Sequence, residues 1–153
     1  LLRSAPVYGV GDSLLDEVGA LLRRSPLIPR FLEEVPLKPV HVGDVAEALL
    51  APCQGEMEIG GEVLTWGGLL LACAEAAGKS LVGPSLSDAT LARLAHTFGD
   101  RGWAGDLVPF DSDSLARHRL GYTTRDNALP SLLGRPPRPL AGYLNHEWVY
   151  RAS

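Results

Sequence analysis

The first residues that could carry chemistry are a histidine and an aspartate three positions apart. His41 and Asp44 lie where an apolar segment, Val35–Val42, runs into an alanine-rich one. A histidine beside a carboxylate can act as a general base or as part of a metal site. At a strand-to-helix junction, however, residues at this spacing point in unrelated directions. Asp44 has the position of a helix N-cap, with Glu47 as its capping-box partner, so a structural role is predicted for it.

A metal centre or a catalytic nucleophile would need further groups. The other histidines and the two cysteines lie in separate contexts, and the cysteines form no CxxC motif: His96, His118, His146, Cys53 and Cys73. No serine or cysteine stands in a Gly-x-Ser-x-Gly turn. Cys73, which lies among alanines and leucines, is predicted to be a core residue. We therefore assign no catalytic residue and no metal ligand.

A glycine pair near the N-terminus invites comparison with a dinucleotide-binding loop. Gly9 and Gly11 follow a predicted strand and precede a predicted helix. The third glycine of that fingerprint is replaced by Leu14, and Asp12 would place a negative charge where a pyrophosphate binds. Asp12 is therefore predicted to be a helix cap and not part of a phosphate loop.

The positions of the lysines exclude a second kind of catalytic site, a tyrosine activated by a nearby lysine. A tyrosine can be made acidic by a lysine one helical turn further along the chain. Lys38 and Lys79 are the two lysines, and the residues four positions before them are Glu34 and Glu75. The chain therefore cannot build a local Tyr-x-x-x-Lys pair.

Composition narrows the class of protein. The 153 residues are 46% hydrophobic and 21% charged, with a net charge of −4. This balance is typical of a globular domain, and it argues against partners that require a basic face, such as nucleic acid or a membrane surface. No apolar run reaches the roughly 18 residues of a membrane span. Together with the sparse cysteines, these features favour a cytoplasmic protein with reduced thiols.

Helices and strands must position any functional residues, and the predicted order of these elements indicates a mixed α/β domain. Strands and helices alternate, which favours parallel pairing in a covered sheet. Strands are predicted over Leu1–Tyr8, Val35–Val42 and Glu56–Ile59. Helices are predicted after Asp12, over Val45–Leu50, from a Thr65 cap to Ala77, from Pro84–Ser85 onward, and near Ser112–Arg119 and Asn127–Leu133. The spacing of the apolar residues in the first of these helices gives it one apolar face: Leu14, Leu15, Val18, Leu21 and Leu22.

The start of the chain suggests that it is part of a longer protein. Leu1 is not an initiator, and the single methionine is Met57. The first residues read as if they begin inside a strand, and three strands are few for a covered parallel sheet. We therefore expect further strands before Leu1.

Three segments in the same order resemble one family, the extended and atypical short-chain dehydrogenase/reductases of the NAD-dependent epimerase/dehydratase group. Arg3–Asp12 is similar to that family's sixth-strand segment and the turn after it. Pro39–Ala48 resembles the strand-to-helix junction ahead of the substrate lobe. Glu56–Thr65, with Gly60 and Gly61, resembles the next strand and turn. Among the branches, residues 111–133 are most like the atypical group.

The resemblance implies a fold and a limited set of site residues. It implies the last strands of a Rossmann-type sheet over residues 1–80 and a helical, loop-rich C-terminal substrate lobe over 81–153, together a single partial α/β domain. The cofactor glycines and the Tyr-x-x-x-Lys pair of the family belong to its first half. The loop that approaches the nicotinamide corresponds to Ser4, Ala5 and Pro6. NAD or NADP is therefore expected in a parent protein and no cofactor in this chain alone.

Two departures from the family concern the substrate. Pro6 stands where sugar-nucleotide epimerases usually have an asparagine, and Leu37 stands where they usually have an arginine that faces the phosphates. Both departures argue against a sugar-nucleotide substrate. The partners implied are the missing N-terminal half, a small-molecule substrate and further copies of the chain. We expect self-association through Leu1, Val7, Val40 and Val42.

One alternative belongs to a different class of protein. The segment 135–139 consists of arginine and proline, which favours an extended polyproline conformation, and Tyr143, Trp148 and Tyr150 follow it. Large aromatic side chains are common interface anchors. A self-contained interaction domain that docks a partner through this tail is therefore the alternative to the substrate-side half of an epimerase-like protein.

Overall fold

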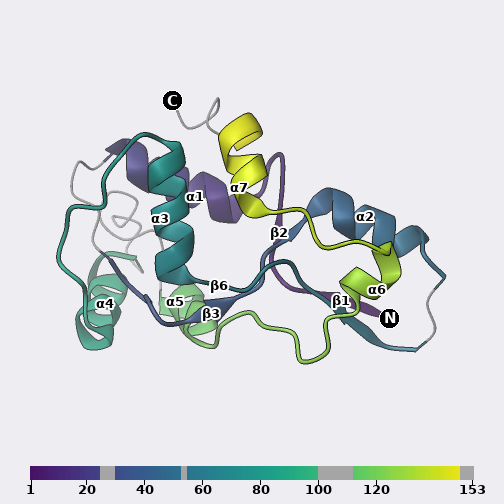
Figure 1. The fold of residues 1–153 in the computed structure, drawn as a ribbon. Helices are drawn as coiled ribbons and strands as arrows, with labels where there is room; N and C mark the ends of the chain where they lie inside the picture. The colour runs from purple at the N-terminus through teal and green to yellow at the C-terminus, as the bar shows by residue number, and fades with distance from the viewer. Residues whose placement is uncertain (25–29, 53–54, 100–111, 149–153) are drawn as a thin grey trace.

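Short strand pairs surrounded by helices form a mixed α/β fold (Figure 1). The computed structural model describes residues 1–24, 30–52, 55–99 and 112–148. The strands are β1 (Leu2–Ser4), β2 (Val7–Tyr8), β3 (Pro36–Leu37), β4 (Val40–His41), β5 (Met57–Ile59) and β6 (Leu64–Thr65). The α-helices are α1 (Ser13–Arg24), α2 (Val42–Leu50), α3 (Trp66–Ala76), α4 (Asp88–Leu94), α5 (Ser112–Arg119), α6 (Leu129–Leu133) and α7 (Leu140–Tyr143).

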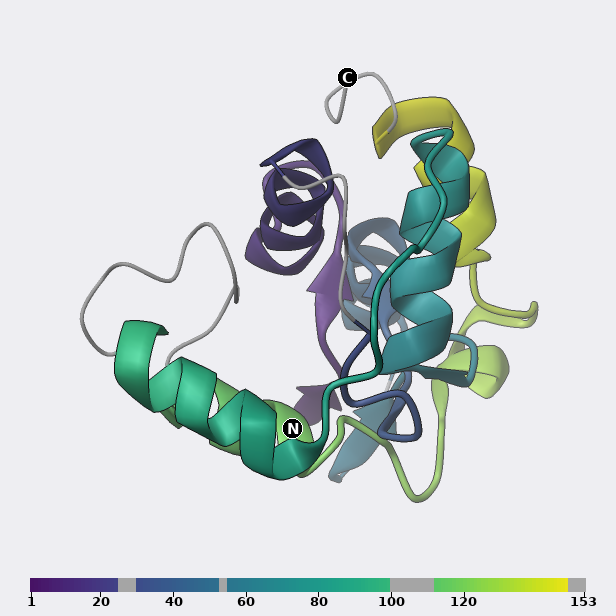
Figure 2. The same ribbon diagram turned by 90° about the vertical axis from the view of Figure 1, so that its left-hand side faces the viewer.

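The strands pair as expected for the edge of a parallel α/β sheet. β1 pairs in parallel with β5, and β2 pairs in parallel with β4, whereas β3 and β6 are antiparallel. The predicted parallel pairing is therefore confirmed. A π-helical turn extends α4 over Ala95–Gly99 and packs on α5 (Figure 2), and another extends α7 over Leu144–Trp148. No helix of the described ranges is long and apolar enough to cross a bilayer.

The predicted strand Leu1–Tyr8 is divided in two where the chain changes its partner. The Ala5 amide still donates to the Ile59 carbonyl of β5 (2.9 Å), but the Pro6 carbonyl accepts from the Val40 amide of β4 (2.9 Å). Proline has no amide hydrogen for a ladder, so a continuous strand cannot run through Pro6. The chain therefore leaves β5 and joins β4 at Ala5 and Pro6.

The predicted strand Val35–Val42 is also divided, because β3 and β4 pair with different neighbours. Between them the Lys38 carbonyl accepts from the Gly61 amide at 3.0 Å. A β-carbon on Gly61 would lie 1.8 Å from the Pro39 carbonyl oxygen, so this close approach requires glycine. The Gly-Gly turn noted in the sequence is thus explained by backbone packing.

Two of the predicted caps are confirmed. Asp12 accepts from the amide of Leu15 (2.7 Å) at the start of α1, and Thr65 accepts from the amide of Gly68 (3.1 Å) at the start of α3. α3 ends before Gly78, whose φ of 66° is the left-handed conformation expected at a helix end. The helix expected from Pro84–Ser85 begins later, at Asp88, because Ser87 is its cap.

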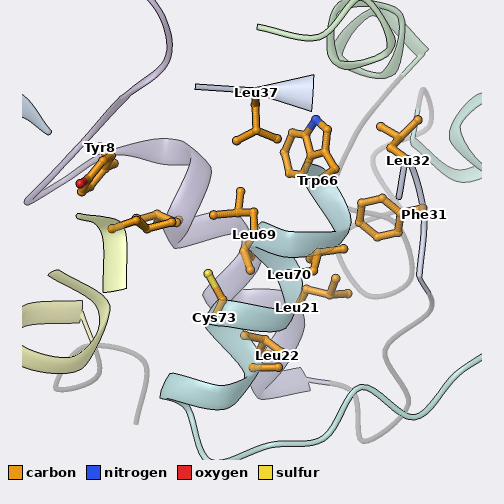
Figure 3. Packing of buried hydrophobic residues seen from close by; sticks show 14 of the residues in the cluster. Tyr8, Leu21, Leu22, Phe31, Leu32, Leu37, Trp66, Leu69, Leu70 and Cys73 are labelled. Atoms are coloured by element: carbon orange, nitrogen blue, oxygen red, sulfur yellow. The ribbon is translucent and has the colours of Figure 1, made fainter. Parts of the chain in front are cut away.

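The main core lies between α1 and α3 (Figure 3). The predicted apolar face of α1 is confirmed, and the predicted core position of Cys73 is confirmed as well. Buried residues of this core include Leu15, Val18, Leu21, Leu22, Trp66, Leu69, Leu70 and Cys73. A second, smaller cluster beneath α2 consists of Val40, Ala48, Ile59 and Leu129.

The described aromatic residues of the tail pack into the main core, which argues against the alternative of a docking segment. Tyr143 and Trp148 are both buried, and the Trp148 indole nitrogen donates to the Leu15 carbonyl at 3.3 Å. A β-carbon on Gly19 of α1 would lie 3.1 Å from the Trp148 ring, so α1 and the tail are in close contact. Tyr150 lies outside the described residues.

A buried carboxylate holds the segment before this tail against α2. Asp44 is fully buried, and its oxygens accept from the Arg135 guanidinium (2.7 Å), the Arg138 guanidinium (2.6 Å) and the Arg138 amide (2.7 Å). Glu47, one turn further along α2, accepts from the same two guanidinium groups at 2.7 and 2.5 Å. These hydrogen bonds hold the pKa of Glu47 below its usual range.

The predicted capping role of Asp44 is therefore wrong. α2 begins at Val42, and its N-cap is His41, whose Nδ1 accepts from the Gly43 amide at 3.0 Å. Asp44 lies inside the first turn, where it faces the arginines. Glu47 likewise pairs with Arg135 and Arg138 instead of completing a capping box.

We expect Trp148→Ala to destabilise the fold strongly. Removal of a buried tryptophan leaves a cavity and typically costs about 3–5 kcal/mol, which corresponds to a fall of about 10 °C in the melting temperature. The matched control is Glu147→Ala at the exposed neighbouring position. Thermal denaturation of both variants measures the difference, and equal melting temperatures would contradict a tail that is part of the core.

Asp44→Ala should lower the free energy of unfolding by more than the loss of a helix cap would. Breaking a buried ion pair costs about 3 kcal/mol even at the lower end of measured values, so the melting temperature should fall by about 6–12 °C. The control is Asp88→Ala, which removes an exposed first-turn aspartate that pairs with Arg119 at 3.8 Å. If both variants lose the same stability in thermal denaturation, Asp44 is not an anchor.

Candidate functional site

The loop predicted to approach a cofactor lines a cavity. Ser4, Ala5 and Pro6 lie where β1 gives way to β2, the point at which the chain changes its strand partner. The cavity measures about 490 Å³ and is closed on one side by Ser4–Val7 and Leu14. This volume lies within the range of small-molecule sites.

The opposite wall comes from α5 and the residues after it. Ser114, Arg117, His118 and Tyr122 line this side. Tyr122 is fixed by its backbone, because its carbonyl accepts from Lys38 (2.8 Å) and its amide donates to Pro36 (3.1 Å). Segments about 110 residues apart in sequence therefore enclose one cavity.

His118 is held in place by aromatic rings. Its imidazole meets Trp66 edge-on with 4.8 Å between ring centroids, and it meets Tyr122 at 5.7 Å. Burial, together with the charge of Arg117, holds the pKa of His118 below its usual value. The imidazole is therefore neutral at neutral pH and offers hydrogen bonding without charge.

His41 and Asp44, the first candidate pair, are not brought together as a site. The His41 ring packs edge-on against Tyr8 (5.3 Å) and Tyr143 (5.7 Å), and its Nδ1 is occupied by the cap. Asp44 is engaged by Arg135 and Arg138. A structural role for both residues is thus supported, and within the described ranges no group of histidine, cysteine and acidic residues could hold a metal ion.

Several other groups that could act as acids, bases or nucleophiles serve the fold. The Lys38 amine donates to the Thr124 carbonyl at 2.9 Å, and the Lys79 amine donates to the Leu22 carbonyl. Burial raises the pKa of the Cys73 thiol to about 12. Cys53 lies outside the described residues.

Leu37 cannot take the place of a ligand-facing arginine, because it is buried in the main core with 1% of its surface exposed.

Sequence reasoning missed Arg117 and His118 as cavity residues. Their positions on a short helix gave no signal in the sequence. Arg135 and Arg138 did have a signal in the sequence, since their spacing of three residues matches that of Asp44 and Glu47.

The comparisons with known proteins identify the fold. No protein-family model matches the chain, and no curated protein matches it. Among solved structures, a nucleoside-diphosphate-sugar epimerase from Staphylococcus aureus is similar with a TM-score of 0.65 and 16% identity. The alignment covers 95% of this chain and 51% of the epimerase.

Two further solved structures give the same result. A UDP-glucose 4-epimerase from Thermotoga maritima, solved with UDP-glucose, has 18% identity and a TM-score of 0.56, with 98% of this chain and 45% of that chain covered. A UDP-glucuronic acid 4-epimerase from Bacillus cereus, solved with UDP-glucuronic acid and NAD, has 18% identity and a TM-score of 0.57, with 97% and 43% covered. The chain therefore spans about half the length of these structures and has a partial Rossmann-type fold of the kind found in sugar epimerases.

Proposed function

We propose that this chain is the C-terminal, substrate-side half of an NAD(P)-dependent epimerase, dehydratase or reductase of the short-chain dehydrogenase/reductase type, and that it is catalytically inert alone. In this proposal the parent protein is cytoplasmic and its first half supplies the cofactor glycines and the catalytic tyrosine and lysine. The fold supports it, because nearly the whole chain aligns with about half of several epimerases.

One observation links the proposal to specific residues. The loop of Ser4, Ala5 and Pro6, which corresponds to the nicotinamide-side loop of the family, lines the same cavity as α5 of the second lobe. A cofactor in a parent protein would thus meet a substrate held by the C-terminal lobe at this cavity. The alternative of a docking domain loses its main support, since Tyr143 and Trp148 are buried.

Cofactor binding tests the proposal. The chain alone should not bind NADH or NADPH in the micromolar range by calorimetry, because the amides at the start of α1 are capped by Asp12 and the third fingerprint glycine is Leu14. Coexpression with the polypeptide encoded directly upstream of Leu1 should restore binding. The proposal fails if the chain alone binds the cofactor at micromolar concentration, or if the upstream sequence encodes no glycine-rich βαβ unit.

A paired substitution in the reconstituted protein tests the loop. Ser4→Phe should weaken cofactor or substrate binding at least tenfold, since one misplaced group in a positioned site costs this much or more, while the melting temperature changes little because Ser4 is exposed. Arg3→Phe is the control, since Arg3 is exposed, pairs with Glu56 and does not line the cavity. Equal binding by both variants would remove Ser4 from the site.

We also propose that the isolated chain self-associates. α2 exposes Val42, Leu49 and Leu50, with exposed fractions of 48%, 65% and 87%, and in the described residues β1 pairs along one edge only. Exposed apolar patches and open strand edges favour association. Val40, which was expected to contribute, is fully buried and is excluded.

The double substitution Leu49→Lys and Leu50→Lys should shift the chain toward monomer in sedimentation velocity. Val82→Lys is the control, because Val82 is an exposed apolar residue (57%) outside α2. A wild-type chain that sediments as a clean monomer at high concentration would contradict self-association.

A further inference from the structure

Among the described residues, one side chain gives the cavity a formal charge. Among the described residues that line it, Arg117 carries the single formal charge, and no carboxylate is present. His118 adds no charge at neutral pH, because burial lowers its pKa. The cavity therefore presents a cation to any molecule that enters it.

Arg117 is not neutralised by a neighbour in the described part of the chain. Its guanidinium donates to the Ser114 hydroxyl at 2.9 Å, which turns it along α5. By contrast, Arg119 on the same helix pairs with Asp88, and Arg135 and Arg138 pair with Asp44. The remaining donors of Arg117 are thus available to an anionic ligand, because a planar guanidinium fork can bind two oxygens of a carboxylate or phosphate.

The rest of the lining selects the shape of the ligand. Pro6, Val7 and Leu14 provide an apolar surface, and the rings of His118 and Tyr122 lie on the other side. With a volume of about 490 Å³, the cavity can hold a ring or a short chain beside a charged group.

We propose that this cavity binds a small molecule in which a phosphate or carboxylate group, held by Arg117, is joined to a compact apolar or ring-shaped part. The inference rests on the proposed function, since it names the ligand class of the same cavity. It assigns recognition of the anion to α5, and so to the C-terminal lobe alone.

The experiment uses the full 153-residue chain labelled with ¹⁵N and titrated without any cofactor. The probes are phenyl phosphate, benzoate and the neutral benzyl alcohol. We expect phenyl phosphate or benzoate to shift the backbone amide signals of residues 4–8 and 114–122. The tighter of the two identifies the anionic group, and benzyl alcohol should bind at least tenfold more weakly.

Arg117→Gln should weaken binding of the anionic probe about tenfold, because a charge-assisted hydrogen bond is lost. Arg93→Gln, which makes the same change on exposed α4, should leave binding unchanged. The proposal is overturned if neither anion binds at millimolar concentration, if benzyl alcohol binds equally well, or if Arg117→Gln binds like the wild type. Any of these results leaves the cofactor test untouched, since that test measures the binding of NADH or NADPH and not of these probes.

Discussion

A single buried carboxylate determines the course of the C-terminal third of the chain. Asp44 has no exposed surface, and an unpaired carboxylate in such a position would be very costly. Arg135 and Arg138 satisfy it with two guanidinium groups and one amide, so the segment that carries them must cross α2 at this point. Buried ion pairs add little net stability compared with apolar packing, but they are costly to break. The role of Asp44 is therefore to fix one route for the chain, and this route joins the two hydrophobic clusters.

The same route completes the framework around the cavity. Beyond Arg138, the Leu140 amide donates to Glu62 at 3.0 Å, and the Tyr8 hydroxyl donates to the Arg138 carbonyl at 2.9 Å. Tyr8 belongs to β2, which follows the loop of Ser4, Ala5 and Pro6, so the C-terminal segment stabilises the strand after this loop. On the other side, the backbone pairing of Tyr122 with Pro36 and Lys38 positions the end of α5. The lining of the cavity thus depends on contacts between residues 78 to 130 positions apart.

This distance in sequence explains which features could be predicted. The caps at Asp12 and Thr65, the apolar face of α1 and the burial of Cys73 follow from residues within one or two helical turns, and each is confirmed. The role of Asp44 depends on partners 91 and 94 residues away, so local capping rules gave the wrong answer. The burial of Trp148 likewise depends on a residue far away in the sequence, since its ring packs closely against Gly19 of α1. The loop of Ser4, Ala5 and Pro6 was found only through a family resemblance, and the α5 wall of the cavity had no local signal.

Several reactive side chains of the described residues are engaged by the fold. Burial raises the pKa of the Tyr8 phenol above its usual range, and its hydroxyl is bound to the main chain. His41 caps a helix, Lys38 is bound to Thr124, and the Cys73 thiol is buried. A catalytic acid or base must lie within reach of the substrate, and none of these four groups lines the cavity. The described side chains that line the cavity offer the Arg117 cation, two serine hydroxyls, the His118 imidazole and the Tyr122 ring. Such a set can hold and orient a ligand, as the proposed substrate-side role requires.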